Sequence, residues 1–224
     1  MNFEGDHEKC LFPVDDGLFA DTFSEESVYR FGGEEVMISQ VFSANLGVAA
    51  PVWDAALCLC RYLEQQSLDL KGKRVIELGA GTGIVGILAA RLGAEVTLTD
   101  LPHAVPQLEK NVLANMPPSG WPSAAPTVAP LSWGLDQTQF PRDWDLVLGA
   151  DIVYLADTYP LLMDTLAHLC RDGATAYLSS KMRGEHGTPG FYADILPQRF
   201  NLQLVCHDLA QNINLYRATL RREG

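Results

Sequence analysis

Apolar and polar residues along this chain follow two different periods, and segments of the two kinds alternate. Short apolar runs predict buried strands, and they lie at 74–78, 95–99, 127–131, 144–150 and 174–179. Between these runs, apolar side chains recur with helical spacing and predict amphipathic helices near 84–92, 102–112 and 162–169. We expect Pro102 to open the second helix, because proline needs no N–H partner in a first helical turn.

Strands that alternate with helices are typical of a doubly wound α/β sheet, since each helix returns the chain to start a parallel strand. The last two apolar segments, 201–206 and 213–220, have no helix between them and predict a hairpin. The final strand should therefore run antiparallel. We predict one Rossmann-like sheet of seven strands, which uses nearly all of the 224 residues.

The N-terminal part has a pattern of its own. Apolar residues alternate over 28–42 on either side of two glycines, which predicts a small hairpin of two short strands. Residues 1–24 are acidic with little periodicity and predict a loosely docked arm. A helix follows at 53–65. We therefore divide the chain into an arm with a hairpin, 1–45, and a main domain, 46–224.

Composition narrows the class of partner. The formal net charge is −12, from 28 acidic and 16 basic residues, which disfavours nucleic acid and anionic membranes and favours a basic partner. The five cysteines include no CxxC pair, and the chain has no apolar run of membrane length and no secretory signal pattern. This indicates a cytoplasmic protein with reduced thiols. The five histidines are scattered, so we expect no metal site.

The junction between the first predicted strand of the sheet and its helix carries the strongest functional signal. Residues 75–83 read Val-Ile-Glu-Leu-Gly-Ala-Gly-Thr-Gly, so an acidic residue, Glu77, precedes three alternating glycines. Glycines let the backbone turn tightly and approach a ligand, and the helix N-terminus behind them offers unpaired N–H groups. We expect a nucleotide-cofactor loop here, with Glu77, Gly79, Ala80 and Gly81 as cofactor-binding residues.

Two cofactors fit this loop. Gly81-x-Gly83-x-x-Gly86 matches the dinucleotide fingerprint, and Asp100 lies an appropriate distance downstream. The acidic residue before the glycines, however, makes this loop similar to that of S-adenosylmethionine-dependent methyltransferases. A seventh strand after a hairpin is likewise similar to the sheet of these enzymes. The single sheet also leaves no room for a separate substrate domain, and we find no hydride-handling His or Tyr-Lys pair. These features favour S-adenosylmethionine.

Residues at the ends of the other strands complete the candidate site. Asp100 closes a strand where a carboxylate can accept both ribose hydroxyls, and it can also cap the turn that follows. Trp133 can pack against adenine or belong to the core, and Trp53 carries the same two interpretations. Ala150 is small and leaves space for a cofactor at the end of its strand.

The strand that ends at Ala150 leads directly into Asp151-Ile-Val-Tyr154. Methyltransferases that act on amide or base nitrogens usually carry (Asp/Asn)-Pro-Pro-Tyr at this place, and both prolines are missing here. A DNA adenine or a glutamine is therefore a poor candidate for the acceptor. Asp151 and Tyr154 remain candidates for catalysis, although a cap and a packing residue would look the same.

Taken together, five segments of the chain resemble the family-16 seven-strand protein-lysine methyltransferases. The resemblance covers about residues 18–220 and rests on the segments 47–50, 52–56, 77–83, 131–134 and 149–154. Flanking segments at 17–21, 180–183 and 185–188 look most like the member of the methyltransferase-like 21 group that methylates a lysine of translation elongation factor 1-alpha. A sibling that acts on a cytosolic heat-shock chaperone matches these flanks less well.

This resemblance implies a monomeric S-adenosylmethionine-dependent enzyme that produces S-adenosylhomocysteine and acts on a protein substrate. It places cofactor contacts on seven residues: Trp53, Gly79, Ala80, Gly81, Asp100, Trp133 and Ala150. Other enzymes, such as a small-molecule methyltransferase or a nicotinamide oxidoreductase, and a non-catalytic cofactor-binding adaptor remain open.

The catalytic hypothesis follows from the charge of the acceptor. A carboxylate favours a lysine ammonium, so we assign Asp151 to capturing and aiming the lysine and Tyr154 to lining its channel. Lys181 and Arg183 follow the fifth strand of the sheet and could dock an acidic strip of the substrate.

Overall fold

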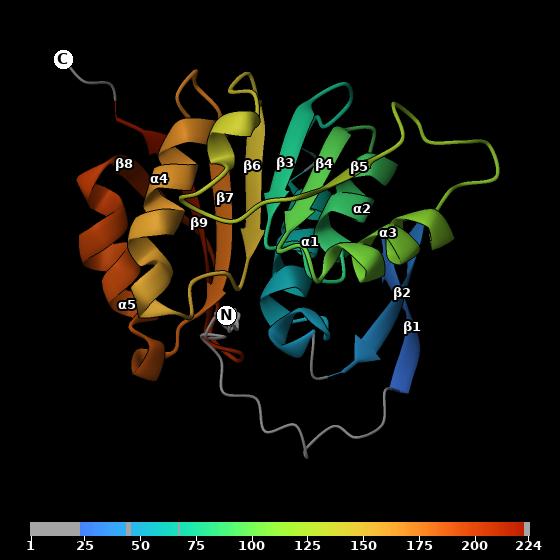
Figure 1. The fold of residues 1–224 in the computed structure, drawn as a ribbon, viewed down its shortest axis with the longest axis horizontal. Helices are drawn as coiled ribbons and strands as arrows, with labels where there is room; N and C mark the ends of the chain where they lie inside the picture. Colours follow the sequence, from blue (N-terminus) through green and yellow to red (C-terminus); the bar gives the residue numbers. More distant parts are fainter. Residues whose placement is uncertain (1–22, 44–45, 67, 222–224) are drawn as a thin grey trace, which may run out of the picture.

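The computed structural model describes residues 23–43, 46–66 and 68–221. Its main sheet has seven strands (Figure 1). In spatial order they are β5 (Thr127–Pro130), β4 (Glu95–Asp100), β3 (Arg74–Leu78), β6 (Leu146–Ala150), β7 (Thr175–Lys181), β9 (Ile213–Leu220) and β8 (Phe200–Asp208). This order confirms the predicted Rossmann-like sheet.

The direction of the last strand follows from its connection. β5, β4, β3, β6 and β7 pair in parallel, whereas β9 lies antiparallel between β7 and β8. Only a short turn separates β8 from β9, so the chain must reverse there. The antiparallel last strand is confirmed, and it inserts between its two neighbours instead of extending the edge.

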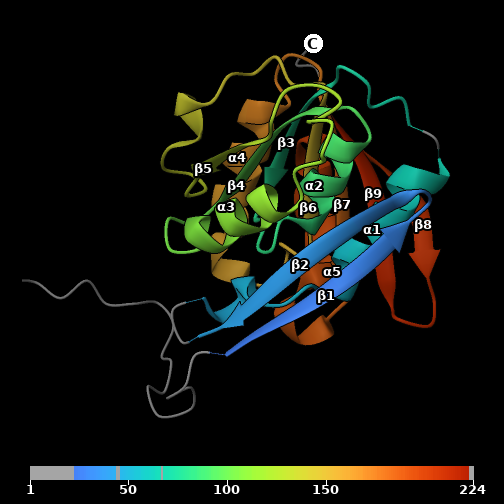
Figure 2. The same ribbon diagram turned by 90° about the vertical axis from the view of Figure 1, so that its right-hand side faces the viewer.

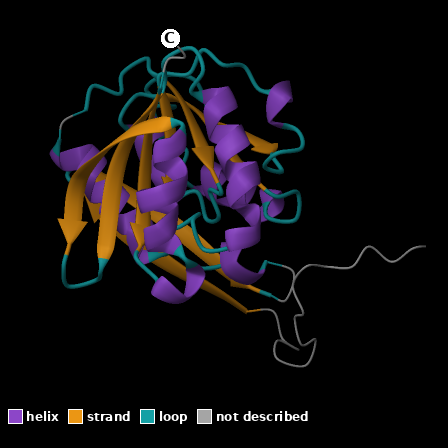
Figure 3. Cartoon of the chain, turned by 90° about the vertical axis from the view of Figure 1, so that its left-hand side faces the viewer, coloured by secondary structure: helices purple, strands orange, loops and turns teal. Residues whose placement is uncertain are grey.

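Helices cover both faces of the sheet (Figures 1 and 3). The described helices are α1 (Asp54–Gln65), α2 (Ile84–Arg91), α3 (Val105–Ala114), α4 (Tyr159–Leu169) and the short α5 (Thr188–Gly190), which continues as a π-helical turn, Phe191–Ile195. Along β3, Val75 belongs to the core under α1 and α2, whereas Ile76 belongs to the core under α4. Neighbouring residues therefore bury opposite faces, as strand geometry requires. Within the described ranges, no helix is both long and apolar enough to cross a membrane.

The N-terminal hairpin pairs β1 (Phe23–Phe31) with β2 (Glu34–Phe42) and lies across the helices of one face (Figure 2). Val36 and Ile38 have no exposed surface and belong to the core under α2. On α3, Asn111 bonds both the N–H and the carbonyl of Ser39, and Asn115 does the same for Met37. The predicted hairpin is confirmed, and α3 holds it by side-chain amides that imitate a third strand.

The start of α3 differs from the prediction. The helix begins at Val105, and its first-turn proline is Pro106, whereas Pro102 lies in the preceding turn. The turn closes through the Ala104 N–H, which donates to the carbonyl of Leu101 at 2.9 Å. Two prolines fit the same first-turn preference, and the sequence pattern assigned it to the wrong one. The predicted arm, apart from its last residues, and the segment 17–21 lie outside the described residues.

Candidate active site

The glycine loop lies where β3, β4 and β6 reach their carboxyl ends, the usual ligand edge of such a sheet. Gly79 has a φ of 59°, which disfavours any other residue. A Cβ at this position would lie 2.7 Å from Cγ2 of Ile152 and 3.4 Å from the ring of Trp133. Gly79 is therefore required both by its backbone angle and by the close approach of two side chains.

Glu77 turns away from the sheet edge and points under α2. Its side chain accepts a hydrogen bond from the Gly86 N–H at 2.9 Å, and the residue is 2% exposed. Burial raises the pKa of Glu77 to about 8; the Gly86 bond opposes the rise and the charge of Asp100 adds to it. In this structure Glu77 joins β3 to α2 and so fixes the loop between them.

Asp100 sits at the end of β4 and faces the glycine loop. One carboxylate oxygen accepts the Gly81 N–H at 2.7 Å, and the other accepts the Leu101 N–H at 2.7 Å. Burial raises the pKa of Asp100, and both of these N–H groups oppose the rise. Each oxygen keeps a free lone pair, so the carboxylate can accept two further hydroxyl donors side by side.

The remaining predicted cofactor residues surround this loop. Ala80 donates its N–H to the carbonyl of Thr99 at 2.9 Å, which ties the loop to β4. Trp133 packs against Gly79, and Ala150 ends β6 as a partly exposed residue. A pair of hydroxyl acceptors, a close glycine backbone and an aromatic ring are the groups that an adenine nucleoside requires, so these residues fit such a cofactor.

Trp53 stands at the entrance of α1, on the other side of the glycine loop. Its indole N–H donates to the carbonyl of Val48 at 2.9 Å, and it remains 38% exposed. The segment that contains Val48 also covers the loop, because a Cβ at Gly81 would lie 3.5 Å from the Ala49 carbonyl oxygen. Trp53 thus anchors this covering segment at the edge of the site.

Asp151 follows β6 directly. It is the centre of a second half of the site, and the first half is the glycine loop with Asp100 and the residues around them. Its φ of 56° is uncommon for a residue with a side chain, and such strain gathers at functional positions. Its carboxylate accepts two hydrogen bonds from the guanidinium of Arg183, at 2.9 and 2.8 Å, and a third from the Lys181 N–H at 3.1 Å. The side chain of Asp151 is only 4% exposed.

This pairing corrects the expected role of Arg183, one of the two cations at the end of β7. Arg183 points inward to Asp151, and its guanidinium also lies 5.5 Å from the centre of the Trp53 ring. Lys181 pairs with Asp54 of α1 at 3.7 Å. The charge of Arg183 is therefore used within the chain, whereas Lys181 remains 40% exposed and its pair with Asp54 lies on the surface. The Asp151–Arg183 pair forms because β6 and β7 are neighbours in the sheet, an order that the sequence analysis did not predict.

Tyr154 lies three residues beyond Asp151 and is partly buried. Burial raises its pKa to about 12, and the negative charges of Asp100 and Asp151 add to the rise. Both carboxylates act on the same phenol, which places Tyr154 between the two halves of the site. The phenol keeps its proton at neutral pH, so it can donate a hydrogen bond or line a channel but is a poor base.

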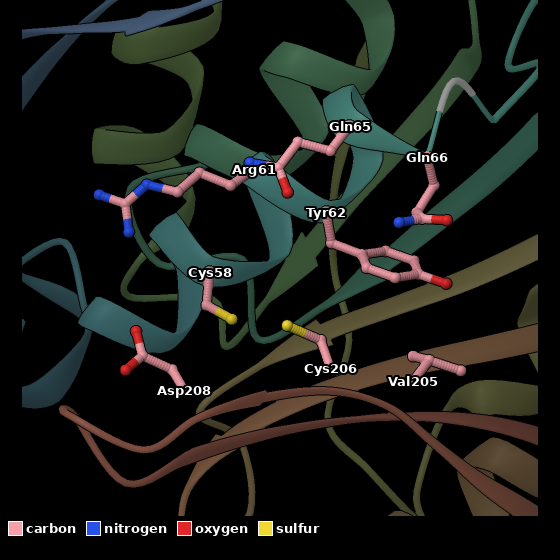
Figure 4. Close-up of a pocket in the computed structure, with 8 residues that line it drawn as sticks. All are labelled: Cys58, Arg61, Tyr62, Gln65, Gln66, Val205, Cys206 and Asp208. Atoms are coloured by element: carbon pink, nitrogen blue, oxygen red, sulfur yellow. The ribbon is translucent and has the colours of Figure 1, made fainter.

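A separate cavity of about 160 Å³ lies between α1 and β8, at a place that the sequence analysis did not predict (Figure 4). The thiols of Cys58 and Cys206 face one another there. Burial raises the pKa of Cys58 to about 11, and the neighbouring Cys206 adds to the rise, so Cys58 is a protonated thiol and a weak nucleophile. The cavity is smaller than typical ligand pockets of roughly 300 Å³ or more, and Glu77, Asp100 and Asp151 are absent from its lining.

Solved structures share this fold. One is a TehB-like SAM-dependent methyltransferase from Corynebacterium glutamicum, with a TM-score of 0.55 and 15% identity; the match covers 79% of this chain and 93% of the bacterial one. At this identity the likeness establishes the fold alone. The fold is that of the SAM-dependent methyltransferases.

Sequence comparison defines the family. A family profile described as lysine methyltransferase matches residues 33–195, and the chain belongs to this family. It is similar to "EEF1A lysine methyltransferase 3" of Xenopus tropicalis, at 61% identity over 90% of this chain and 88% of the relative. It is also similar to "Protein N-lysine methyltransferase METTL21A" of Danio rerio, at 42% identity over 96% and 98%.

Proposed function

We propose that this protein transfers a methyl group from S-adenosylmethionine to a lysine side chain of translation elongation factor 1-alpha. The observation that carries the substrate is the 61% identity, over nearly the whole chain, to a relative named for that activity. A relative whose name states no substrate, METTL21A, is less similar at 42% identity, so the comparisons favour elongation factor 1-alpha. Membership of the lysine methyltransferase family supports catalysis over an adaptor role.

The first half of the site is proposed to hold the cofactor. Asp100 accepts the ribose hydroxyls through its two free lone pairs, and the backbone of Gly79, Ala80 and Gly81 lies against the nucleoside. Trp133 and Ala150 border it, and Trp53 closes it through the covering segment. Glu77 contributes indirectly: its carboxyl bonds the Gly86 N–H of α2 and so holds the glycine loop in place. When bound, the cofactor supplies a methyl group on a positively charged sulfur.

The second half is proposed to receive the lysine. A free lysine has a pKa of about 10.4, so its deprotonation at pH 7 costs about 4–5 kcal/mol. Asp151 orients the amine by accepting a hydrogen bond, and Tyr154 lines the channel as a neutral phenol. The burial around these residues favours the neutral amine, which is the nucleophilic form. The rest of the rate acceleration comes from placement of the amine in line with the methyl group.

The proposal extends to the setting of the enzyme. Residues 46–224 form the catalytic domain, and 1–45 an arm with the hairpin. We propose a cytoplasmic monomer whose partner is a protein. The net charge of −12 supports a basic protein substrate and opposes binding to nucleic acid or to anionic membranes.

The test is methyl transfer from labelled S-adenosylmethionine to purified elongation factor 1-alpha, with the modified peptide mapped. We expect label on one or a few lysines. Asp100→Asn should weaken cofactor binding about tenfold in calorimetry, because an amide replaces one hydroxyl acceptor with a donor. Absence of label from the protein, or binding of NAD in place of S-adenosylmethionine, would contradict the proposal.

A further inference from the structure

The carboxylate assigned to aim the lysine is already neutralised by the chain itself. Arg183 binds both oxygens of Asp151, and the Lys181 N–H binds one of them again. Oδ1 therefore accepts two hydrogen bonds, whereas Oδ2 accepts one. A single lone pair on Oδ2 remains, which is enough for one amine N–H to donate to it without displacing the arginine.

Arg183 is held firmly in this position. Its side chain is 19% exposed and packs over Trp53, and its guanidinium meets the carboxylate in the two-point geometry that makes such pairs strong. The hydrogen bond to Asp151 raises the pKa of Arg183, and the charges of Glu185 and Asp54 add to the rise. The guanidinium therefore keeps its charge throughout the working pH range.

We propose that Arg183 is a positioning residue for methyl transfer. It cancels the charge of Asp151, so that the entering lysine meets a carboxylate that accepts a hydrogen bond but carries no net negative charge. This inference rests on the proposed function. A bare carboxylate beside the amine would favour the ammonium, which has no lone pair to attack the methyl group. The ion pair keeps the directional hydrogen bond of Asp151 and removes the charge that would hold the proton on the lysine.

Other titratable groups also face the pair. Asp54 of α1 and Glu185 of the turn after β7 act on Arg183, and Tyr154 and Tyr192 lie within the field of Asp151. Lys181 of β7 pairs with Asp54, and Asp100 of β4 acts on Tyr154. These groups are the same in the wild-type chain and in variants of Asp151 or Arg183. A difference between such variants therefore reports on the ion pair alone.

The experiment is single-turnover methyl transfer by the full chain, with saturating cofactor and elongation factor 1-alpha, from about pH 6.5 to about pH 9.5. Arg183→Met exposes the amine to a bare carboxylate. We expect its rate to be about tenfold lower at pH 7 and to recover at alkaline pH. The midpoint of the curve of rate against pH, which reports deprotonation of the lysine, should move up by about one pH unit. In steady-state assays at pH 7, the variant's KM for the protein substrate should not rise, because the ammonium is then bound better.

The reciprocal variants give the sign of the effect. Asp151→Asn leaves an unpaired guanidinium, so its midpoint should move to lower pH even though the rate falls. The double variant Asp151→Asn with Arg183→Met has no net charge at the pair, and its midpoint should return to that of the wild type. Arg183→Lys keeps the charge and should hold the midpoint while it loses the two-point geometry.

Arg199→Met is the matched control, because Arg199 pairs with Asp164 at 2.9 Å on an exposed surface, and its midpoint should equal that of the wild type. If Arg183→Met lowers the rate equally at every pH, or raises kcat/KM in steady-state assays, the inference is wrong. Should that variant not fold, the shifts of Asp151→Asn and Arg183→Lys decide. Absence of transfer by the wild type would instead refute the proposed function.

Discussion

Replacing Glu77 by glutamine should remove a pH dependence from the stability of the fold. The carboxyl is 2% exposed and accepts the N–H of Gly86. Burial raises its pKa from 4.5 to about 8. An acid whose pKa is raised in the folded state binds its proton more tightly there than in the unfolded chain. Its stabilising contribution is complete below pH 4.5 and is lost as the pH rises to about 8.

The size of this loss follows from linkage. Each pKa unit is worth about 1.36 kcal/mol, so ionisation of Glu77 removes about 5 kcal/mol between the two pKa values and about 3 kcal/mol by pH 7. Glutamine is neutral at every pH, and its amide oxygen can accept the same N–H. The variant should therefore gain stability relative to the wild type as the pH rises, by about 1.4 kcal/mol per pH unit.

The assay is urea unfolding of both proteins from about pH 5 to about pH 8, with the difference in unfolding free energy plotted against pH. Taking the difference cancels every group that titrates alike in the two chains. A constant difference in unfolding free energy between the two proteins is also expected, because the glutamine NH₂ needs hydrogen-bond partners of its own. Two curves that stay parallel over this range would refute the reasoning, since Glu77 would then have the same pKa folded and unfolded.

Two further predictions concern the loop that Glu77 supports. Gly86→Ala should destabilise the fold by about 2 kcal/mol, because its Cβ would lie 2.5 Å from the Glu77 carboxylate and the helix-propensity gain of about 1 kcal/mol is smaller than this overpacking cost. Gly33→Ala, with open space around its Cβ, should change the melting temperature little. Asn111→Ala should cost about 2–4 kcal/mol in urea unfolding and also weaken cofactor binding several-fold, because this buried amide bonds both the hairpin and the glycine loop. Asn115→Ala removes two hairpin bonds and one to the Asn111 carbonyl, but none to the glycine loop, and should leave cofactor affinity unchanged.

Each of these comparisons has an outcome that contradicts it. A Gly86→Ala protein as stable as the Gly33→Ala control would mean that α2 can move off the Glu77 carboxyl without cost. Equal cofactor affinities in the two asparagine variants, measured by calorimetry under conditions where both are folded, would show that the hairpin and the glycine loop are not coupled.

The strands and most helices could be predicted because their signal is local. β3 and β9 have the bounds predicted for them, and β4 and β6 lie within one or two residues of the predicted ends. In each of these strands the buried face reads directly as an apolar run, and glycines or charged residues mark its end. The start of α3 could not be fixed in this way, because Pro102 and Pro106 offer equivalent local signals and only the tertiary turn distinguishes them.

The site was predicted as a set of residues, but not as a set of contacts. Glu77 looked like a ligand-facing acid because it precedes the glycines. Strand alternation, however, places it on the same face as Val75, which α2 covers. The Asp151–Arg183 pair joins the ends of β6 and β7, so it depends on their being neighbours and on the unusual φ of Asp151. Neither property is written in a local pattern.

Three carboxylates at the ends of three neighbouring strands would repel one another if all were bare, and the fold treats each differently. Glu77 is turned into the core and given one amide, so its pKa rises. Asp151 is given a guanidinium. Asp100 is given two backbone N–H groups and, among the described residues, no ion-pair partner. Asp100 is thus the carboxylate best able to take hydroxyl donors, and Asp151 the one best able to accept from a neutral amine, which separates the two halves of the site by charge.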